Sequence, residues 1–242
     1  MNNNNVIRQW RYWMGIMLLS TLGSVSLPLK AMTLTINTEE YPPFNYLDDQ
    51  GQIIGSATLL LRNALRQADI EAYFRLLPWA RAFTEARLRP LHCVYSTTRT
   101  REREALFDWV GPLVVNEWAA FSLADRGLSI ATLEELRHLR VGGFREDAVG
   151  DYVAAQGINV IRAPSEQENI ARLKAGLIDV VVTGKATGEF MATKQNIALE
   201  HLFTFSSAPL YLACHLSVPD ALLARLQTQL ALLVEDEQEM RQ

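Results

Sequence analysis

Strand-like and helix-like segments alternate from residue 32 onward, and this alternation constrains the fold more than any other feature. Residues 32–37 alternate apolar and polar side chains, as a half-buried strand does. Residues 55–68 instead place Leu60, Leu61 and Ala64 at helical spacing. Strands that alternate with helices are typical of α/β proteins with largely parallel sheets. The sequence therefore predicts an α/β protein.

The same patterns predict the remaining elements. Pro78 suits a helix start, and Thr132 and Ser165 each begin a Ser/Thr-x-x-Glu capping box that opens a helix. Further strands are expected over residues 71–77, 91–96, 113–123, 140–144, 160–163, 179–183 and 210–217, and helices over 79–88, from 132, over 147–156, from 165 to Gly176 and over 219–233.

The strand and helix pattern restarts near residue 120, which indicates two lobes. We expect the first lobe to begin with residues 32–118, the second lobe to span 119–207, and residues 208–242 to return to the first lobe. Two extended segments would then cross between the lobes. With 49% hydrophobic residues the chain can bury a full core.

Residues 1–31 resemble a secretory signal peptide. Arg8 and Arg11 precede an apolar run over residues 13–27, whose length suits export better than a membrane span. We expect cleavage after Ala31, with Ser26 as the second choice, and no lipid attachment, because no Cys lies directly after the apolar run. The protein is thus expected in the periplasm; a retained N-terminal anchor is the alternative.

The charge balance excludes two classes of partner. Three of the 23 Lys and Arg residues lie in the predicted signal peptide, whereas all 27 Asp and Glu residues follow it. An acidic chain of this kind suits neither nucleic acid nor an anionic membrane, which both need a basic surface. The four histidines show no ligand spacing with Cys or carboxylates, so we predict no metal and no cofactor.

Cys93 and Cys214 are the only cysteines and lie in two separate predicted strands. Export to an oxidising compartment would permit a disulfide between them. Two free, buried thiols are the alternative.

A dense polar run, residues 96–103, follows the predicted strand at 91–96. Ser96 and Thr98 offer hydroxyls, and Arg99, Arg101 and Arg103 offer guanidinium groups. An arginine fork matches the two oxygens of a carboxylate, and nearby hydroxyls can satisfy its remaining lone pairs. The run therefore indicates a site for a small anion. A solvated charge run paired with Glu102 and Glu104 is the alternative.

The order of motifs resembles that of the bacterial periplasmic solute-binding proteins of the amino-acid-binding family, the receptors of ABC importers. The resemblance covers residues 32–236 and rests on the segments Tyr-Pro-Pro-Phe at 41–44, Leu-Pro-Trp-Ala-Arg-Ala at 77–82, residues 99–112, and Leu-Lys-Ala-Gly-Leu-Ile-Asp at 173–179. It implies a type II periplasmic-binding-protein fold, in which two α/β lobes joined by two hinge strands close on a ligand.

The resemblance also implies a set of ligand-binding residues. Tyr41 matches the aromatic ring that packs on the ligand, and Ser96 and Thr98 match hydroxyls that accompany the carboxylate-binding arginine. Arg103 is the preferred arginine, followed by Arg101 and then Arg99. Arg81, one turn inside the helix at 79–88, is a further candidate. Cys93 and Cys214 would lie in neighbouring strands.

One position departs from the family. The acidic residue that neutralises the ligand's α-amino group is expected five positions after Asp179, where this chain has Gly184. Either Asp147, at a helix start, substitutes for it, or the ligand lacks an ammonium group. Asp147 is also a natural helix N-cap.

These observations predict a monomeric receptor that binds a small carboxylate-bearing solute, an amino acid or a related organic acid, and delivers it to an ABC importer. Two alternatives remain open. One is an enzyme on the same scaffold, with a cyclohexadienyl-dehydratase-like activity and Glu40, Asp147 or Glu189 as its acid. The other is a stand-alone periplasmic sensory module.

Overall fold

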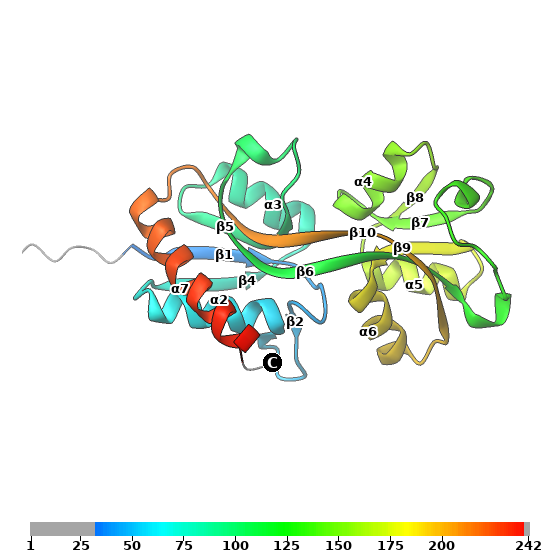
Figure 1. Cartoon of the computed structure of the whole chain (residues 1–242), viewed down its shortest axis with the longest axis horizontal. Coiled ribbons are helices and arrows are strands. Elements are labelled where there is room, and N and C mark those ends of the chain that lie inside the picture. The colour runs from blue at the N-terminus through cyan, green and yellow to red at the C-terminus, as the bar shows by residue number, and fades with distance from the viewer. Residues whose placement is uncertain (1–31, 240–242) are drawn as a thin grey trace, which may run out of the picture. The chain divides into compact units, whose positions relative to one another are not determined.

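The computed structural model describes residues 32–239, and its central feature is an eight-stranded sheet (Figure 1). The strands follow the order β4-β1-β5-β10-β6-β9-β7-β8. Their bounds are β1 (Leu34–Thr38), β4 (Ala72–Leu76), β5 (His92–Thr98), β6 (Asp108–Leu123), β7 (Val141–Phe144), β8 (Val160–Ala163), β9 (Val180–Gly184) and β10 (Leu199–Cys214). A separate hairpin pairs β2 (Tyr46–Leu47) with β3 (Ile53–Ile54).

Each end of the sheet is a parallel α/β lobe. In the first lobe β1 lies parallel to both β4 and β5; in the second lobe β7 lies parallel to both β8 and β9. The first lobe carries α2 (Ser56–Gln67), α3 (Trp79–Leu88) and α7 (Asp220–Glu239), and the second carries α4 (Ala148–Ala155), α5 (Glu166–Lys174) and α6 (Lys185–Gln195). The predicted α/β fold class is confirmed.

Two long strands connect the lobes. β6 and β10 pair antiparallel from Leu123 opposite Leu199 to Asp108 opposite Cys214, and Figure 1 shows them side by side. β10 pairs with β5 of the first lobe, and β6 pairs with β9 of the second. The predicted boundaries at 118/119 and 207/208 fall inside these strands and stay predictions. The predicted signal peptide, residues 1–31, lies outside the described residues.

The predicted helices form where an apolar stripe meets the sheet. Leu60, Leu61 and Ala64 of α2 are buried in one core cluster with Ile36 of β1. Helix α3 begins at Trp79, directly after Pro78, whose carbonyl accepts the N–H groups of residues 81 and 82. Ser165 caps α5 by accepting the N–H of Glu168 at 3.2 Å, as its capping box predicts.

Three expectations about elements need correction. The segment after Thr132 forms only the short 3₁₀ helix η3 (Glu134–His138): Glu135 accepts the Thr132 N–H and hydroxyl, as the capping box predicts, but the chain is extended again at Leu139 and enters β7 at Val141. The last helix continues to Glu239 rather than 233. The first part of β10 and all of α6 have no counterpart in the prediction. Short 3₁₀ turns η1 (Glu104–Leu106) and η2 (Ala124–Arg126) complete the structure.

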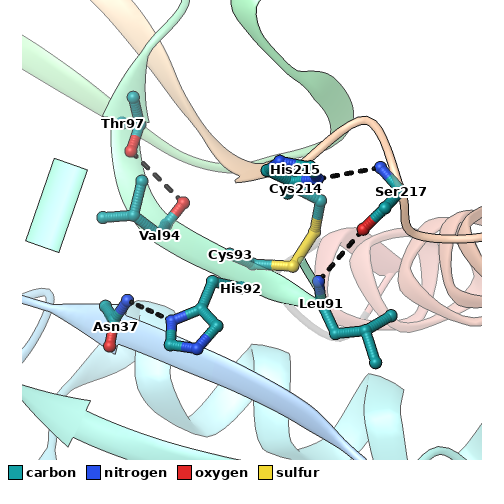
Figure 2. The surroundings of a disulfide bond; sticks show 9 residues. All are labelled: Asn37, Leu91, His92, Cys93, Val94, Thr97, Cys214, His215 and Ser217. Carbon is teal, nitrogen blue, oxygen red and sulfur yellow. Dashed lines mark hydrogen bonds between the residues drawn. A yellow bond between two sulfur atoms is a disulfide. The ribbon is translucent and has the colours of Figure 1, made fainter. Parts of the chain in front are cut away.

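A disulfide joins the first lobe to the returning strand. Cys93 of β5 and Cys214 of β10 are register partners, and their sulfur atoms are bonded at 2.07 Å (Figure 2). Beside them the Ser217 hydroxyl accepts the N–H of Leu91 at 3.1 Å, which holds the chain after β10 against the turn before β5. The disulfide therefore fixes the end of β10 within the first lobe.

Candidate functional site

Arg103 lies where the two lobes meet. It follows β5 of the first lobe and is half-buried. Its guanidinium donates to the Thr98 carbonyl at 3.2 Å and, across the lobes, to the Glu146 carbonyl at 3.0 Å. The group also lies over the rings of Trp79 and Phe83, 5.5 and 5.2 Å from their centroids. Burial lowers the pKa of Arg103, and the charge of Asp147 opposes that effect.

The carbonyl of Glu146 receives a second donor from the first lobe. The indole Nε1 of Trp79, at the start of α3, donates to it at 3.0 Å. Glu146 lies in the turn between β7 and α4 and has a positive φ of 59°. One backbone oxygen of the second lobe is thus shared by Trp79 and Arg103. We call this pair of bonds the Glu146 bridge.

A cavity of about 400 Å³ opens beside Arg103, and we call it the arginine cavity. Trp79, Phe83 and Leu106 form its apolar walls. Arg162 of β8 lines it from the second lobe, where it pairs with Asp151 at 2.8 Å. A guanidinium has five N–H donors, and two of those of Arg103 are used by carbonyls. Arg103 can therefore still bind an anionic group.

Tyr41 occupies the position next to Gly184. It follows β1, is 3% exposed, and its hydroxyl accepts an N–H from the Asn116 side chain at 2.8 Å. A Cβ atom at Gly184 would lie 2.6 Å from Asn116 Oδ1 and 2.7 Å from Tyr41 Oη. The space expected for an acidic side chain is therefore filled by the Tyr41–Asn116 pair, and a glycine at 184 leaves room for it.

The hydroxyl residues of the polar run lie at the end of β5. Ser96 and Thr98 are both buried, and Ser96 has a positive φ of 57°. The Ser96 hydroxyl donates to the Asn45 side-chain oxygen, so it is held by the segment after β1. Thr98 contacts Arg103 through its backbone carbonyl.

Asp147 is the N-cap of α4. Its carboxylate accepts the N–H of Val149 at 3.0 Å and lies within the electrostatic range of Arg103. Burial raises its pKa, while the charge of Arg103 lowers it. A direct contact between Asp147 and a ligand stays a prediction.

The structure does not bring the other predicted arginines into this group. Arg81 is exposed and pairs with Glu85 at 3.0 Å, a carboxylate that also binds Arg75 at 2.7 Å. Arg101 is exposed. Arg99 pairs with Glu104 and lies over the Trp109 ring, 5.6 Å from its centroid. For Arg99 the charge-run interpretation therefore describes the observed contacts.

A second cavity, of about 290 Å³, lies between the ends of β1 and β4 in the first lobe and the start of α5 in the second. Glu39, Glu40 and Glu166 line it together with Trp79 and Phe144, and we call it the acidic cavity. Glu39 is 9% and Glu166 3% exposed. Sequence reasoning missed Glu39 and Glu166, although a Glu-Glu pair directly before Tyr41 and the first residue of a capped helix were signals that it did not use.

The electrostatics of the acidic cavity are unusual. Burial, with the charges of Asp147 and Glu166, raises the pKa of Glu39 well above its usual value; Arg103 opposes this. Burial, followed by the charge of Asp147, raises the pKa of Glu166 to about 8, although Thr183 donates to its carboxylate at 2.8 Å. Within residues 32–236, no three His, Cys, Asp or Glu side chains are grouped to hold a metal ion.

No helix in the described part of the chain has the length and apolarity needed to cross a membrane. No curated protein matched the sequence at a significant level. Residues 34–148 match the family model of bacterial extracellular solute-binding proteins, family 3.

Solved structures with the same fold cover most of the chain. A histidine kinase sensor domain with similarity to periplasmic binding proteins has a TM-score of 0.78 and 23% identity over 85% of this chain and 92% of its own. Truncated, arginine-bound ArgBP from T. maritima has a TM-score of 0.75 and 21% identity over 83% of this chain and 96% of its own.

A third match is the amino acid ABC transporter substrate-binding protein AbpA from Streptococcus pneumoniae bound to L-arginine, with a TM-score of 0.75 and 16% identity over 85% of this chain and 90% of its own. At these identities the likeness establishes the periplasmic-binding-protein fold. The match over residues 34–148 and the shared fold confirm the predicted resemblance of this chain to the bacterial extracellular solute-binding proteins of family 3.

Proposed function

We propose that the protein is a periplasmic receptor that binds a small carboxylate-bearing solute, an amino acid or a related organic acid, between its two lobes. The receptor acts as a monomer and delivers the solute to the membrane subunits of an ABC importer. It returns its ligand chemically unchanged.

The observation that carries this proposal is the position of Arg103. Its guanidinium is half-buried at the junction of the lobes, lines a cavity and keeps N–H donors beyond the two that bind carbonyls. Charge-assisted hydrogen bonds to a carboxylate contribute roughly 1.5–3 kcal/mol each, more than bonds between neutral groups. Arg103 is therefore the group best suited to orient an anion.

Closure follows from a ligand that contacts both lobes. Such a ligand stabilises the closed form by its difference in affinity for the closed and open forms. The first lobe supplies Arg103, Thr98, Ser96 and Tyr41, and the second supplies the turn at Glu146 and the capped start of α4 at Asp147. Arg81 and Arg101 play no part in this proposal, because Arg81 is paired with Glu85 and both are exposed.

A sensory role is the second candidate, and the likeness to a histidine kinase sensor domain favours it. The two roles differ in the partner that recognises the closed form. Ligand uptake by cells with and without the protein tests the importer role. A ligand-dependent change in the phosphorylation of a kinase, with uptake unchanged, would support the sensory role instead.

A thermal-shift screen tests the proposal directly. Amino acids, dicarboxylates and other small acids are added singly, and a ligand should raise the melting temperature in a concentration-dependent way. Each hit is then recovered and analysed, because an enzyme would convert it, whereas a receptor returns it intact. Failure of every carboxylate-bearing compound to shift the melting curve would contradict the proposal.

A further inference from the structure

The acidic cavity contains two buried carboxylates, those of Glu39 and Glu166, that form no ion pair within the described residues. Within the described residues the Glu39 side chain makes no hydrogen bond and no ion pair, although the residue is only 9% exposed and lines the cavity. Glu166 accepts hydrogen bonds only from neutral groups, the Thr183 hydroxyl at 2.8 Å and the Asn169 amide at 3.4 Å. The third carboxylate, Glu40, accepts the backbone N–H of Leu47 at 3.2 Å.

Other buried carboxylates of this chain are treated differently. Glu85 is 6% exposed and binds Arg75 at 2.7 Å and Arg81 at 3.0 Å. Asp179 is 9% exposed and binds Arg140 and Arg126, and the hydrogen bonds from Arg140 lower its pKa to about 2. Each of these two carboxylates is thus bound by two arginines. Within the described residues, no arginine binds the carboxylate of Glu39 or Glu166.

An unpartnered buried carboxylate is costly, because burial removes the water that stabilises its charge. A cation placed between Glu39 and Glu166 would offset that cost for both side chains. Arg103 is not that cation. Its charge lowers the pKa of Glu39, but it forms no ion pair with Glu39. Its guanidinium instead binds the carbonyls of Thr98 and Glu146 and lines the arginine cavity.

The cavity walls distinguish an organic cation from a metal ion. Trp79 and Phe144 form apolar and aromatic surfaces beside the carboxylates, which suit an alkyl chain and a cation over a ring. The described His, Cys, Asp and Glu residues form no metal-binding group. At about 290 Å³ the cavity is at the lower end of the range for small-molecule sites, so it fits one end of a ligand.

We propose that the acidic cavity binds an ammonium or guanidinium group at the end of the ligand's side chain, through Glu39 and Glu166, with the alkyl chain against Trp79 and Phe144. This inference rests on the proposed receptor function, because it names the ligand class of the same interlobe site. Trp79 lines both cavities. The two cavities therefore share the Trp79 side chain as a wall.

Matched ligand pairs test this inference by titration calorimetry. L-Arginine is compared with L-citrulline, and L-lysine with L-norleucine; each second, neutral partner keeps the α-ammonium and α-carboxylate groups but has an uncharged side chain. Agmatine supplies the guanidinium group without the carboxylate. We expect each cationic member to bind at least tenfold more tightly than its neutral partner. Glu39→Gln should weaken the binding of each cationic member more than that of its neutral partner and so reduce this preference. Glu200→Gln, an exposed residue outside both cavities, is the control variant and should leave every affinity unchanged.

A second measurement is the number of protons released on ligand binding. A cation beside Glu166 should ionise its carboxyl group, so binding at pH 7 should release up to about one proton per ligand, detected as a dependence of the heat on the ionisation enthalpy of the buffer. Neutral partners and the Glu166→Gln variant should release none. This measurement stays informative if Glu39→Gln proves unstable.

The outcomes separate this inference from the receptor function. Equal affinities for cationic and neutral partners, both lost in Arg103→Ala, would overturn the inference and leave the receptor function standing. Binding of agmatine with no binding of any carboxylate would support the inference and contradict the receptor function. If no compound of either kind binds, both are overturned.

Discussion

At the scale of single residues, the decisive contrast is between carboxylates that the chain pairs with arginine and those that it does not. Glu166 is 3% exposed and its pKa is raised to about 8 by burial, whereas Asp179 is held by two arginines. A group that the fold forces towards its neutral form lowers stability once solution pH would ionise it. Glu166 lies at the junction of the lobes, where a bound cation would stabilise its ionised carboxylate.

The pH dependence of stability should reveal Glu166. Because its folded pKa of about 8 exceeds its usual 4.5, its contribution is fully present below pH 4.5 and is lost as pH rises through 8. The difference in free energy of unfolding between Glu166→Gln and wild type should therefore grow by about 3 kcal/mol, in favour of the variant, as the pH rises from 5 to 8. Chemical denaturation at several pH values measures this. Glu200→Gln is the control and should give a difference that does not vary with pH.

Gly184 provides a second residue-scale prediction. Gly184→Ala should destabilise the protein by about 1 to 3 kcal/mol, because the new Cβ would overlap the Asn116 and Tyr41 side chains. Asn116→Ala removes the nearest atom, so the double variant should lose less stability than the two single variants together. Strictly additive losses in a double-mutant cycle would show that the three residues do not share this space.

At the scale of elements, the sequence predicts what depends on local pattern and fails where distant partners decide. The bounds of α3 and β8 agree with the prediction, because a proline and an apolar run mark them clearly. Helix α6 was missed: of its buried residues Thr187, Gly188, Met191 and Ala192, only Met191 is large and apolar, and Gly188 lies against the Phe121 ring. The sequence of α6 therefore shows no clear helical spacing of apolar residues.

The site divides in the same way. Arg103 was predictable because a motif carries it, whereas Glu39 and Glu166 come together only through the pairing of two lobes. Glu166 also begins a capped helix, which gave a sufficient local reason for its presence. The sequence around Glu166 therefore indicates a helix start but not its position in the wall of a cavity.

The disulfide gives an element-scale prediction, because it closes a loop with a sequence separation of 121 residues between β5 and β10. Replacing both Cys93 and Cys214 by Ser should lower the free energy of unfolding by about 3 to 5 kcal/mol. Denaturation with and without reductant measures this: wild type in reductant should match the double variant, and the double variant should be insensitive to reductant. A wild-type curve that reductant leaves unchanged would contradict the prediction.

At the scale of the whole molecule, the central element is the Glu146 bridge between the lobes. Trp79 and Arg103 both donate to the same carbonyl, so the bridge links the conformation of the lobes to the arginine that we propose binds the ligand. A variant that weakens the bridge lowers the population of the closed form and with it the apparent affinity. We propose that closure and binding are coupled through this backbone oxygen.

Trp79→Phe tests this coupling, because it removes the Nε1 donor and retains an aromatic ring. Loss of one hydrogen bond, worth about 0.5–1.5 kcal/mol, should weaken ligand binding by roughly two- to tenfold. Small-angle scattering of the free protein should report a larger radius of gyration for the variant than for wild type. Unchanged affinity and unchanged scattering would show that the bridge does not govern closure.

The most direct test of the account is the affinity of Arg103→Ala, measured by titration calorimetry with the best ligand from the thermal-shift screen. Arg101→Ala is the matched control, because Arg101 belongs to the same polar run and is exposed. We predict that Arg103→Ala weakens binding about 100-fold, whereas Arg101→Ala leaves it within about twofold. Equal affinities in the two variants would contradict the claim that the arginine at the lobe junction holds the ligand.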